Sequence, residues 1–458
     1  MHLEIPVKLS CDKQLTEEDQ VQERLYVEFV AVLGEEGFSL DELVIRVKEI
    51  QQKEGMPGLV GLLLQLYEEM ICIALIERKR QWNWSKCCED PKWGYYSSSK
   101  RRFRTTIGKV KIRWRRLKCV KCKRSIIPLK EALGLKSYQS KSGEVERVVI
   151  EIASEQSYRR GSSHMEKIGA MPIPKSTAHR WVMLSDVELF QIGRKSSNVI
   201  IADGTGYKPR AGEKKGELRV ALGFTRNGDA FPLGSWSGQS WEEIGEELAK
   251  KLRRRKKAEM LICDGEPGLA EALSQLANQV QRCHWHQVHD LDRLMWWDKA
   301  PLKQRRKAQS ELSTILGIEL PQTDYQPITK KDKQQLIESM KDSLDKFEKL
   351  TRQLYFAGYI QAAVYMKRAK DSMFNYIRLW LQTGIITPRV SSFIERTMRE
   401  IARRLKKIGF GWSKKGATKM SYIVMKRFTA AADWNAYWEK KLGITGNVMI
   451  FYRGIKCA

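Results

Sequence analysis

The sequence has no hydrophobic segment of the kind that directs a protein out of the cell. Residues 1–20 carry several acidic side chains and no apolar core of signal-peptide length. The most apolar stretch, Gly58–Ile76, is interrupted by Glu68 and Glu69, which would be costly in a lipid-spanning helix. We therefore expect a protein that stays inside the cell, is not inserted in a membrane, and buries this stretch as an amphipathic helix.

Acidic residues are scarce relative to basic ones. The chain has 54 Asp and Glu against 82 Lys and Arg, which gives a formal net charge of +28. The basic residues recur in several regions instead of on one amphipathic helix, which argues against a membrane-surface protein. Such an excess predicts a polyanionic partner, and nucleic acid is the leading candidate.

Cysteine is too irregular for a disulfide framework, because the nine residues are an odd number in a long chain without a signal peptide. Cys119 and Cys122 have the spacing of a zinc knuckle, but the opposite pair, Cys87 and Cys88, is adjacent. A four-thiolate site would require both neighbouring cysteines to converge on one ion, which is strained. Three thiolates with another ligand, and free structural thiols, are the alternatives.

At 458 residues, of which 42% are hydrophobic, the chain is too long for one ordinary core and rich enough to bury several. Residues 1–82 show helical spacing, as at Val21, Leu25 and Phe29, and predict a helical region for packing or dimerisation.

Residues 83–140 change character and predict a small β region. The alternation over Thr105–Trp114 predicts a strand. Twelve Lys and Arg, and no acid, lie between Arg101 and Ser125. We expect a phosphate-binding face in this region. Its candidate DNA contacts are Arg101, Arg102, Arg104, Arg113, Arg115 and Arg116.

Residues 141–190 predict three short helices, the last of them capped by Ser176. Lys175, His179 and Arg180 would project from its exposed side. This layout is typical of a helix-turn-helix whose last helix enters a major groove, although a three-helix linker has the same pattern.

From Asn198 onward the pattern is α/β. Over residues 195–300 it predicts three strands, a helix that Ser240 caps, and a further strand that ends before Asp264. This is the order of an RNase H-like fold. Residues 301–387 predict a helical insertion, residues 388–425 return to the core, and residues 426–458 are a C-terminal tail. The core helix over 390–407 is expected to bury Phe393, Ile394, Met398, Ile401 and Leu405.

Two strands each deliver an aspartate at the same end. Asp203 and Asp264 both follow buried strands and precede glycine. One Asp-Gly would simply begin a turn, but two in this order predict a carboxylate pair that a divalent cation neutralises, with Mg²⁺ the expected ion. Glu395, early in a helix, is the candidate third carboxylate. Glu400 is the rival, and it more naturally pairs with the arginines around it.

These residues carry a resemblance to a known family. The chain resembles the Mutator-type DDE transposases and their bacterial insertion-sequence relatives. The resemblance lies in the order of Asp203, Asp264, the stretch Cys283-His284-Trp285-His286, a helical insertion and Ser391–Arg396. Cys283 and His286 match the Cys-x-x-His signature of that family. The segment Arg102–Leu135 resembles the zinc-ribbon-like lead-in of some of these enzymes. The resemblance spans about residues 85–425.

The resemblance implies that Asp203, Asp264 and Glu395 ligate two Mg²⁺ ions, for which Mn²⁺ can substitute. Water would cut the phosphodiester at a transposon end, and the freed 3′ hydroxyl would join target DNA. The implied partners are double-stranded DNA at the element's ends and target, and a second copy of the chain or more. The implied location is the cytoplasm of a prokaryote, at the nucleoid.

The Cys-His cluster and the basic helix after Glu395, both near the implied site, can each be interpreted in more than one way. Cys283, His284, His286 and His289 could be zinc ligands, but their spacing is too tight for a tetrahedron without a distant partner. A supporting or DNA-facing role for Cys283 and His286 is preferred over ordinary buried side chains.

The basic helix after Glu395 could lie along DNA, or be a solvated charged face. Its candidate contacts are Arg396, Arg399, Arg403, Arg404 and Trp412.

Two alternatives to a transposase remain. The first is an RNase H-like nuclease or resolvase without strand transfer, which usually lacks a large helical insertion. The second is a non-catalytic DNA-binding regulator derived from a transposase, against which the presence of all three carboxylates argues.

Overall fold

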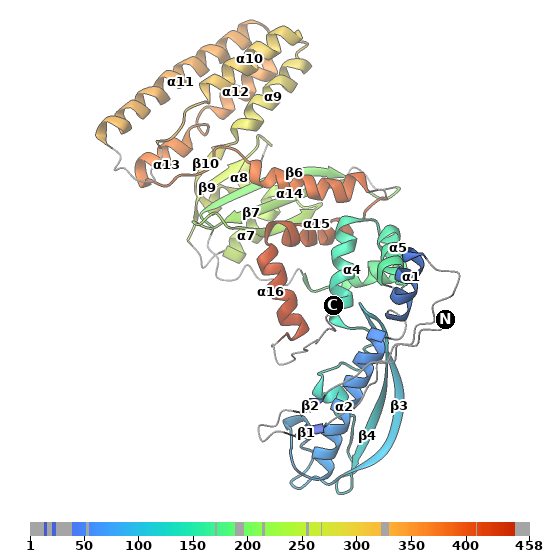
Figure 1. Cartoon of the computed structure of the whole chain (residues 1–458). Coiled ribbons are helices and arrows are strands. Elements are labelled where there is room, and N and C mark those ends of the chain that lie inside the picture. The colour runs from blue at the N-terminus through green and yellow to red at the C-terminus, as the bar shows by residue number, and fades with distance from the viewer. Residues whose placement is uncertain are drawn as a thin grey trace, which may run out of the picture. The chain divides into compact units, whose positions relative to one another are not determined.

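The computed structural model describes residues 13–15, 21–23, 39–51, 55–169, 172–187, 197–212, 216–252, 256–266, 268–321, 329–408 and 410–444. The chain divides into two compact units (Figure 1). The first contains Met1–Val145 and His164–Pro172, and the second contains Glu146–Ser163 and Ile173–Ala458. Each unit is described by itself.

The first unit begins with a two-stranded antiparallel sheet instead of a helix. The strands are β1 (Lys13–Leu15) and β2 (Val21–Glu23). The helical interpretation is therefore wrong at Val21, while Leu25 and Phe29 lie outside the described residues. Helices follow further along the region, as predicted. They are α1 (Leu40–Ile50) and α2 (Met56–Ile76).

Helix α2 is buried on one face only. Cys72 and Leu75 are buried, whereas Leu62 and Tyr67 are exposed. The expected burial of this stretch is therefore only partly confirmed. Among the described residues α2 is the one helix that is long and apolar enough to cross a membrane, and 22% of its most apolar window is buried. Its Glu68 is fully buried, and one carboxylate oxygen accepts from the Arg115 backbone N–H at 2.8 Å.

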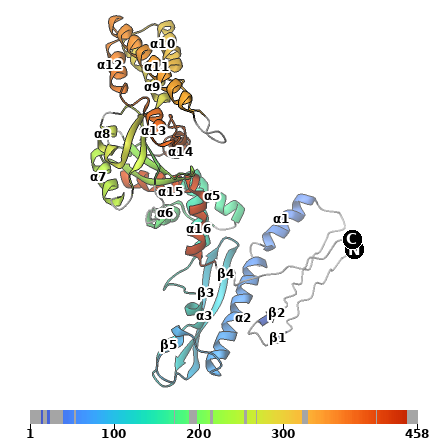
Figure 2. The same ribbon diagram turned by 90° about the vertical axis from the view of Figure 1, so that its left-hand side faces the viewer.

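A three-stranded antiparallel sheet packs against α2 (Figure 2). Its strands are β3 (Trp93–Thr105), β4 (Gly108–Cys119) and β5 (Ser125–Ile126). The alternation read as one strand over Thr105–Trp114 is in fact a turn followed by β4, because Gly108 has a φ of 122° and reverses the chain. The helices η2 (Asn83–Ser85) and α3 (Pro128–Ala132) flank this sheet.

Three helices form where the sequence predicted them. They are α4 (Gly143–Glu155), α5 (Tyr158–Gly169) and α6 (Lys175–Leu184). Ser176 does not cap α6, because Pro174 is the residue before the first turn and no side chain accepts from the turn. Proline presets a backbone angle that suits this junction, so the helix begins without a hydroxyl cap.

The second unit is built on a five-stranded mixed sheet with the order β10-β9-β6-β7-β8. The first three strands along the chain run antiparallel, and β9 and β10 are parallel to β6. Their bounds are β6 (Val199–Tyr207), β7 (Gly216–Phe224), β8 (Ala230–Ser237), β9 (Ala258–Cys263) and β10 (Ala277–Arg282). Strand β6 runs beyond Ala202, so Asp203 lies inside a strand and does not follow one.

Helices cover this sheet. They are α7 (Trp241–Leu252), α8 (Leu269–Leu273), η4 (Ser274–Leu276), α14 (Ser392–Ala402), a π-helical turn (Arg403–Lys407), α15 (Lys414–Thr429) and α16 (Ala431–Leu442). Ser240 caps α7 as predicted, because its hydroxyl accepts from the Glu243 N–H at 3.2 Å. Helix α14 packs on β6, and α15 packs on β8.

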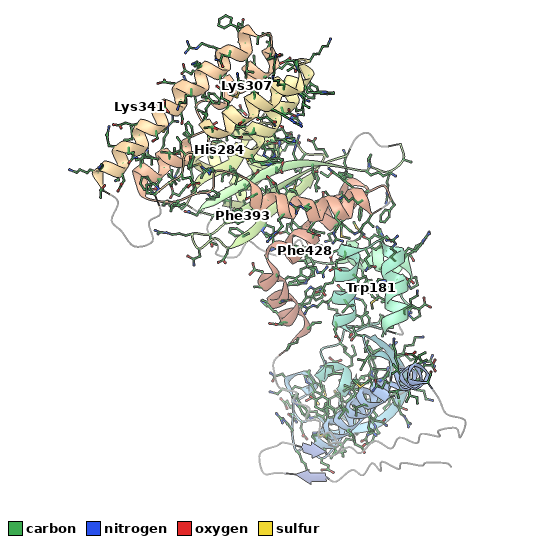
Figure 3. The ribbon with its side chains drawn as sticks, turned by 45° about the horizontal axis from the view of Figure 1, so that its top comes forward. Trp181, His284, Lys307, Lys341, Phe393 and Phe428 are labelled. Atoms are coloured by element: carbon green, nitrogen blue, oxygen red, sulfur yellow. The ribbon has the colours of Figure 1, made fainter. Side chains whose placement is uncertain are left out.

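Two predictions about the last part of the chain need correction. Phe393, labelled in Figure 3, is 57% exposed, although it touches the ring of Phe224. The other four members of the expected stripe are buried. Residues 426–442 are not a tail, because α15 and α16 continue to Leu442 and bury Trp434 and Trp438.

Between β10 and α14 the chain forms a helical body with its own core. Its helices are α9 (His284–Trp297), α10 (Leu302–Ile315), α11 (Lys330–Phe356), α12 (Ile360–Ala369) and α13 (Asn375–Thr383). The predicted insertion started at residue 301, but Leu291 and Met295 of α9 belong to the same core. The helical body therefore starts at His284.

Candidate active site and thiol cluster

Asp203 and Asp264 come from neighbouring parallel strands. Ala202 of β6 and Cys263 of β9 are paired, so the residue after each lies at the same level of the sheet. Burial and then the charge of Asp264 raise the pKa of Asp203 to about 7, although His286 opposes this shift. The structure therefore brings the two predicted aspartates together, close enough to repel each other.

Glu266 is a third carboxylate at this place that the sequence interpretation did not assign. Its backbone N–H donates to Asp264 Oδ1 at 3.0 Å. A Cβ built on Gly204 would lie 3.1 Å from Glu266 Oε2, so this carboxylate lies against the backbone beside Asp203. Burial raises the pKa of Glu266, and the charge of Asp264 raises it further. Arg219 Nη2 lies 3.4 Å from Glu266 Oε1. The signal in the sequence was the second acid of Asp264-Gly265-Glu266.

Glu395 lies on α14, which packs against the strand that carries Asp203. Its Oε1 atom is buried and has no hydrogen-bond partner among the described residues. A buried oxygen without a donor is unfavourable by roughly 1–3 kcal/mol, so this atom is suited to a ligand. Apart from the thiol cluster described below, no group of three or more metal-ligating side chains converges in the described part of the chain.

The Cys-x-x-His residues connect the two segments that carry the carboxylates. The Cys283 N–H donates to the Cys263 carbonyl at 2.9 Å, next to Asp264. The Cys283 thiol accepts from the Ser391 N–H at 3.3 Å, and the Ser391 hydroxyl lies 3.4 Å from His286 Nδ1. Because Ser391 precedes the first turn of α14, these contacts orient the helix that carries Glu395.

His286 is a half-buried side chain whose pKa is raised beside the carboxylates. Burial lowers its pKa, but Cys283 and the carboxylates of Asp203 and Asp264 outweigh burial and raise the pKa to about 9. For Cys283, burial raises the pKa while His286 lowers it, and the net direction is downward. His284 is separate from this pair, because its Nε2 bonds to the Met373 carbonyl at 2.6 Å. The four residues considered as zinc ligands therefore do not converge.

Arg282 braces the loop that carries Asp264. Its Nη1 donates to the Asp264 carbonyl at 2.8 Å, and its guanidinium lies over the Tyr365 ring at 4.9 Å. A Cβ built on Gly265 would lie 1.4 Å from Arg282 Nη2. A side chain at position 265 would displace this guanidinium, so Gly265 has a packing role beyond its place in a turn.

The four cysteines near β3 and β4 form a cluster. The sulfur atoms of Cys87, Cys88, Cys119 and Cys122 all lie within 4.8 Å of one another. The two adjacent cysteines therefore converge, in contrast to the strain expected from their spacing. Burial raises the pKa of the Cys119 thiol. Hydrogen bonds from backbone N–H groups, of which that of Cys122 has the largest effect, outweigh burial and lower this pKa to about 6. The donor set and spacing suit a tetrahedral thiolate site for zinc.

The basic residues predicted to contact DNA have different environments. Most are exposed: Arg101, Arg102, Arg104, Arg113, Arg116, Lys175, His179, Arg180, Arg396 and Arg399. Arg115 is partly buried and lies 3.6 Å from Glu69. Arg403 bonds to Glu400 at 2.9 Å, so the pairing expected for Glu400 is confirmed.

Arg404 and Trp412 do not fit the predicted DNA contacts. Arg404 is fully buried, and its Nε donates to the Ala153 carbonyl at 2.6 Å. The guanidinium lies 4.7 Å from the Trp412 ring, which is 3% exposed, and also stacks on Tyr158 and Phe410. The expectation is wrong for these two residues, because the arginine satisfies the carbonyl inside an aromatic cluster.

No known family model matches the chain, and no curated protein matches it. Among solved structures, the chain is similar to one described as "CryoEM structure of simian T-cell lymphotropic virus intasome in complex with PP2A regulatory subunit B56 gamma". The identity is 12%, the match covers 39% of this chain and 77% of that one, and the TM-score is 0.15. At that TM-score the likeness carries no argument about the fold.

Proposed function

We propose that this protein is a DDE transposase with an RNase H-like core. The observation that carries the proposal is the pair formed by Asp203, inside β6, and Asp264, directly after the neighbouring parallel strand β9. The strand order β10-β9-β6-β7-β8, with three antiparallel strands followed by two parallel ones, supports an RNase H-like core. Glu395 on α14 completes the proposed set of three carboxylates.

Asp203, Asp264 and Glu395 are the residues that would hold two Mg²⁺ ions, for which Mn²⁺ can substitute. Their fit rests on the repelling pair of aspartates and on the buried, unpartnered Oε1 of Glu395. When bound, such ions activate the attacking oxygen and stabilise charge on the phosphodiester. Glu266 is close enough to the pair to contribute a further oxygen.

The chain's own residues position this set. Cys283 and Ser391 hold the start of α14 against the end of β9, and Arg282 holds the carbonyl of Asp264. His286 contributes positive charge beside the aspartates. These contacts fix the backbone segments that carry the carboxylates, which is how supporting side chains tune a metal site.

The proposed partner is double-stranded DNA at the ends of a mobile element and at its target, bound by two or more copies of the chain at the nucleoid in the cytoplasm. The net charge of +28 supports a polyanionic partner. We propose in addition that the cluster of Cys87, Cys88, Cys119 and Cys122 binds structural zinc, which the convergence of four sulfurs supports. An RNase H-like nuclease without strand transfer is the second candidate function, and it shares the same carboxylates.

A transposition assay separates these candidates. A plasmid carrying this gene with its flanking genomic DNA is incubated with the protein, a target plasmid and Mg²⁺, and joined products are sequenced. Joined ends with a duplicated target site support strand transfer, whereas cleavage without joining would replace the proposal with a nuclease. Asp203→Asn, Asp264→Asn and Glu395→Gln should each abolish both products. Glu400→Gln, on the same helix, is the matched control and should retain activity.

A further inference from the structure

The outer face of the β3–β4 hairpin carries cations directly opposite one another. The strand register pairs Lys100 with Arg113, Arg102 with Lys111, and Arg104 with Lys109. Partners in an antiparallel register project from the same face. These six residues are all exposed, and they alternate along β4 with buried Val110, Ile112 and Trp114. We call this face the cation ladder.

Two of the predicted arginines have other partners in this unit. Arg101 pairs with Ile112 and lies over the Trp114 ring at 5.3 Å, on the side that packs against α2. Arg115 is 3.6 Å from Glu69 of α2. The predicted phosphate-binding region is therefore one face of a ribbon, and it includes Lys100, Lys109 and Lys111, which the sequence interpretation did not single out.

The cation ladder is unfavourable in the protein alone. Like charges directly opposite in a sheet destabilise it, and none of the six side chains forms an ion pair within the described residues. Glu144, near the tip of the hairpin, accepts from the Thr106 hydroxyl at 2.8 Å. Three consecutive repulsive pairs are explained if an external polyanion neutralises them.

We infer that the cation ladder binds the phosphate backbone of double-stranded DNA. A two-stranded ribbon fits the major groove of B-form DNA, whereas the major groove of A-form RNA is too deep and narrow. Lysine and arginine that form no ion pair within the described residues suit contacts that are independent of base sequence. This inference rests on the proposed function for its choice of DNA, but it concerns a surface in the first unit and does not involve the carboxylates.

The test is the salt dependence of DNA binding by the full chain. Lys100→Gln, Arg102→Gln and Arg104→Gln are combined, and binding to a duplex of about 30 base pairs is measured without divalent metal. Each lost phosphate contact reduces the slope of log K against log salt by about 0.9. We expect the slope to fall by about 2 to 3 and the affinity at about 0.1 M salt to fall roughly tenfold or more.

The matched control removes the same charge from another surface. Lys331→Gln, Lys333→Gln and Lys341→Gln change exposed residues of α11, of which Lys341 is labelled in Figure 3. This variant should leave the slope close to the wild-type value. The melting temperature of the ladder variant should equal or exceed that of the wild type, because repulsive pairs are removed. That readout shows the variant is folded.

An unchanged slope in the folded ladder variant would overturn the inference. Tighter, ladder-dependent binding to an RNA duplex than to the DNA duplex would overturn the choice of DNA. The proposed function fails separately: if no joined products form while the slope still falls, the binding surface stands and the transposase proposal does not.

Discussion

The backbone N–H of Ser391 donates to the thiol of Cys283 at 3.3 Å, across 108 residues of sequence. One residue of this pair follows β10, and the other begins α14. The contact therefore joins the sheet edge next to Asp264 to the helix that carries Glu395.

Cys283→Ala should reduce joining activity by about tenfold to a hundredfold, because a displacement of roughly 1 Å at a reacting site can have an effect of that size. The reason is that α14 loses the acceptor that holds its first turn. Activity is measured as kcat and KM for joined product, with duplex binding as a parallel readout. We expect kcat to fall while duplex affinity stays constant, and Cys283→Ser, which retains an acceptor, to recover part of the loss. Cys72→Ala, another buried cysteine, is the control, and an equal loss there would show a general folding defect.

Asp203 should make the stability of the metal-free protein depend on pH. Burial, and then the charge of Asp264, raise its pKa from 3.8 to about 7. The folded state therefore holds a proton that the unfolded state releases, so this contribution to stability is complete below 3.8 and disappears as pH rises through about 7. The melting temperature of wild type relative to Asp203→Asn should fall over that interval. Asp342→Asn, at an exposed position, should show no such trend, and parallel curves for wild type and Asp203→Asn would contradict the assignment.

The thiol cluster should contain about one zinc ion per chain in purified protein, measured by elemental analysis. Cys122→Ser should remove most of that zinc, because three thiolates remain where four converge. Chelation should lower the melting temperature of the first unit, since binding free energy at such a site is folding free energy. Cys72→Ser changes a cysteine outside the cluster and should retain the metal. If the purified wild-type protein is folded but contains no zinc, the zinc proposal is wrong and the four cysteines are structural thiols.

Arg404→Ala should destabilise the second unit by about 3 kcal/mol, because it creates a cavity and leaves the Ala153 carbonyl without its donor. Urea unfolding measures the change. Arg399→Ala, an exposed residue on the adjoining helix, should change the free energy of unfolding by less than about 0.5 kcal/mol. If Arg404 contacted DNA instead, its variant would be stable and would bind DNA with a smaller salt slope.

Local patterns predicted the elements of this chain better than their ends. The strand before Asp264, the Ser240 cap and the three helices over 141–190 follow from periodicity and capping residues. The extension of β6 through Asp203 does not, because Gly204 and Gly206 read as a turn and are held in the strand only by pairing with β7. Tertiary pairing overrides local preference at such positions.

The candidate active site was predictable only where local sequence patterns determine which residues meet. Asp203 and Asp264 could be found because neighbouring parallel strands bring corresponding residues together. Burial of Arg404 could not be anticipated, since it depends on Tyr158 and Trp412, which are distant in sequence. The convergence of the adjacent Cys87 and Cys88 on Cys119 and Cys122 likewise depends on a backbone path that no spacing rule specifies.

The chain enters and leaves the helical body at one point, where the His284 N–H donates to the Arg389 carbonyl at 3.0 Å. The body has its own core, so it can fold while the sheet on either side is still incomplete. Its folding brings the two ends of a long loop together and removes most of the entropy loss of closing that loop. Glu395 would otherwise have to find its strand across a large sequence separation, which is slow. We therefore expect the helical body to form before the carboxylate site, so that a variant that slows its folding delays formation of the site even when every carboxylate is intact.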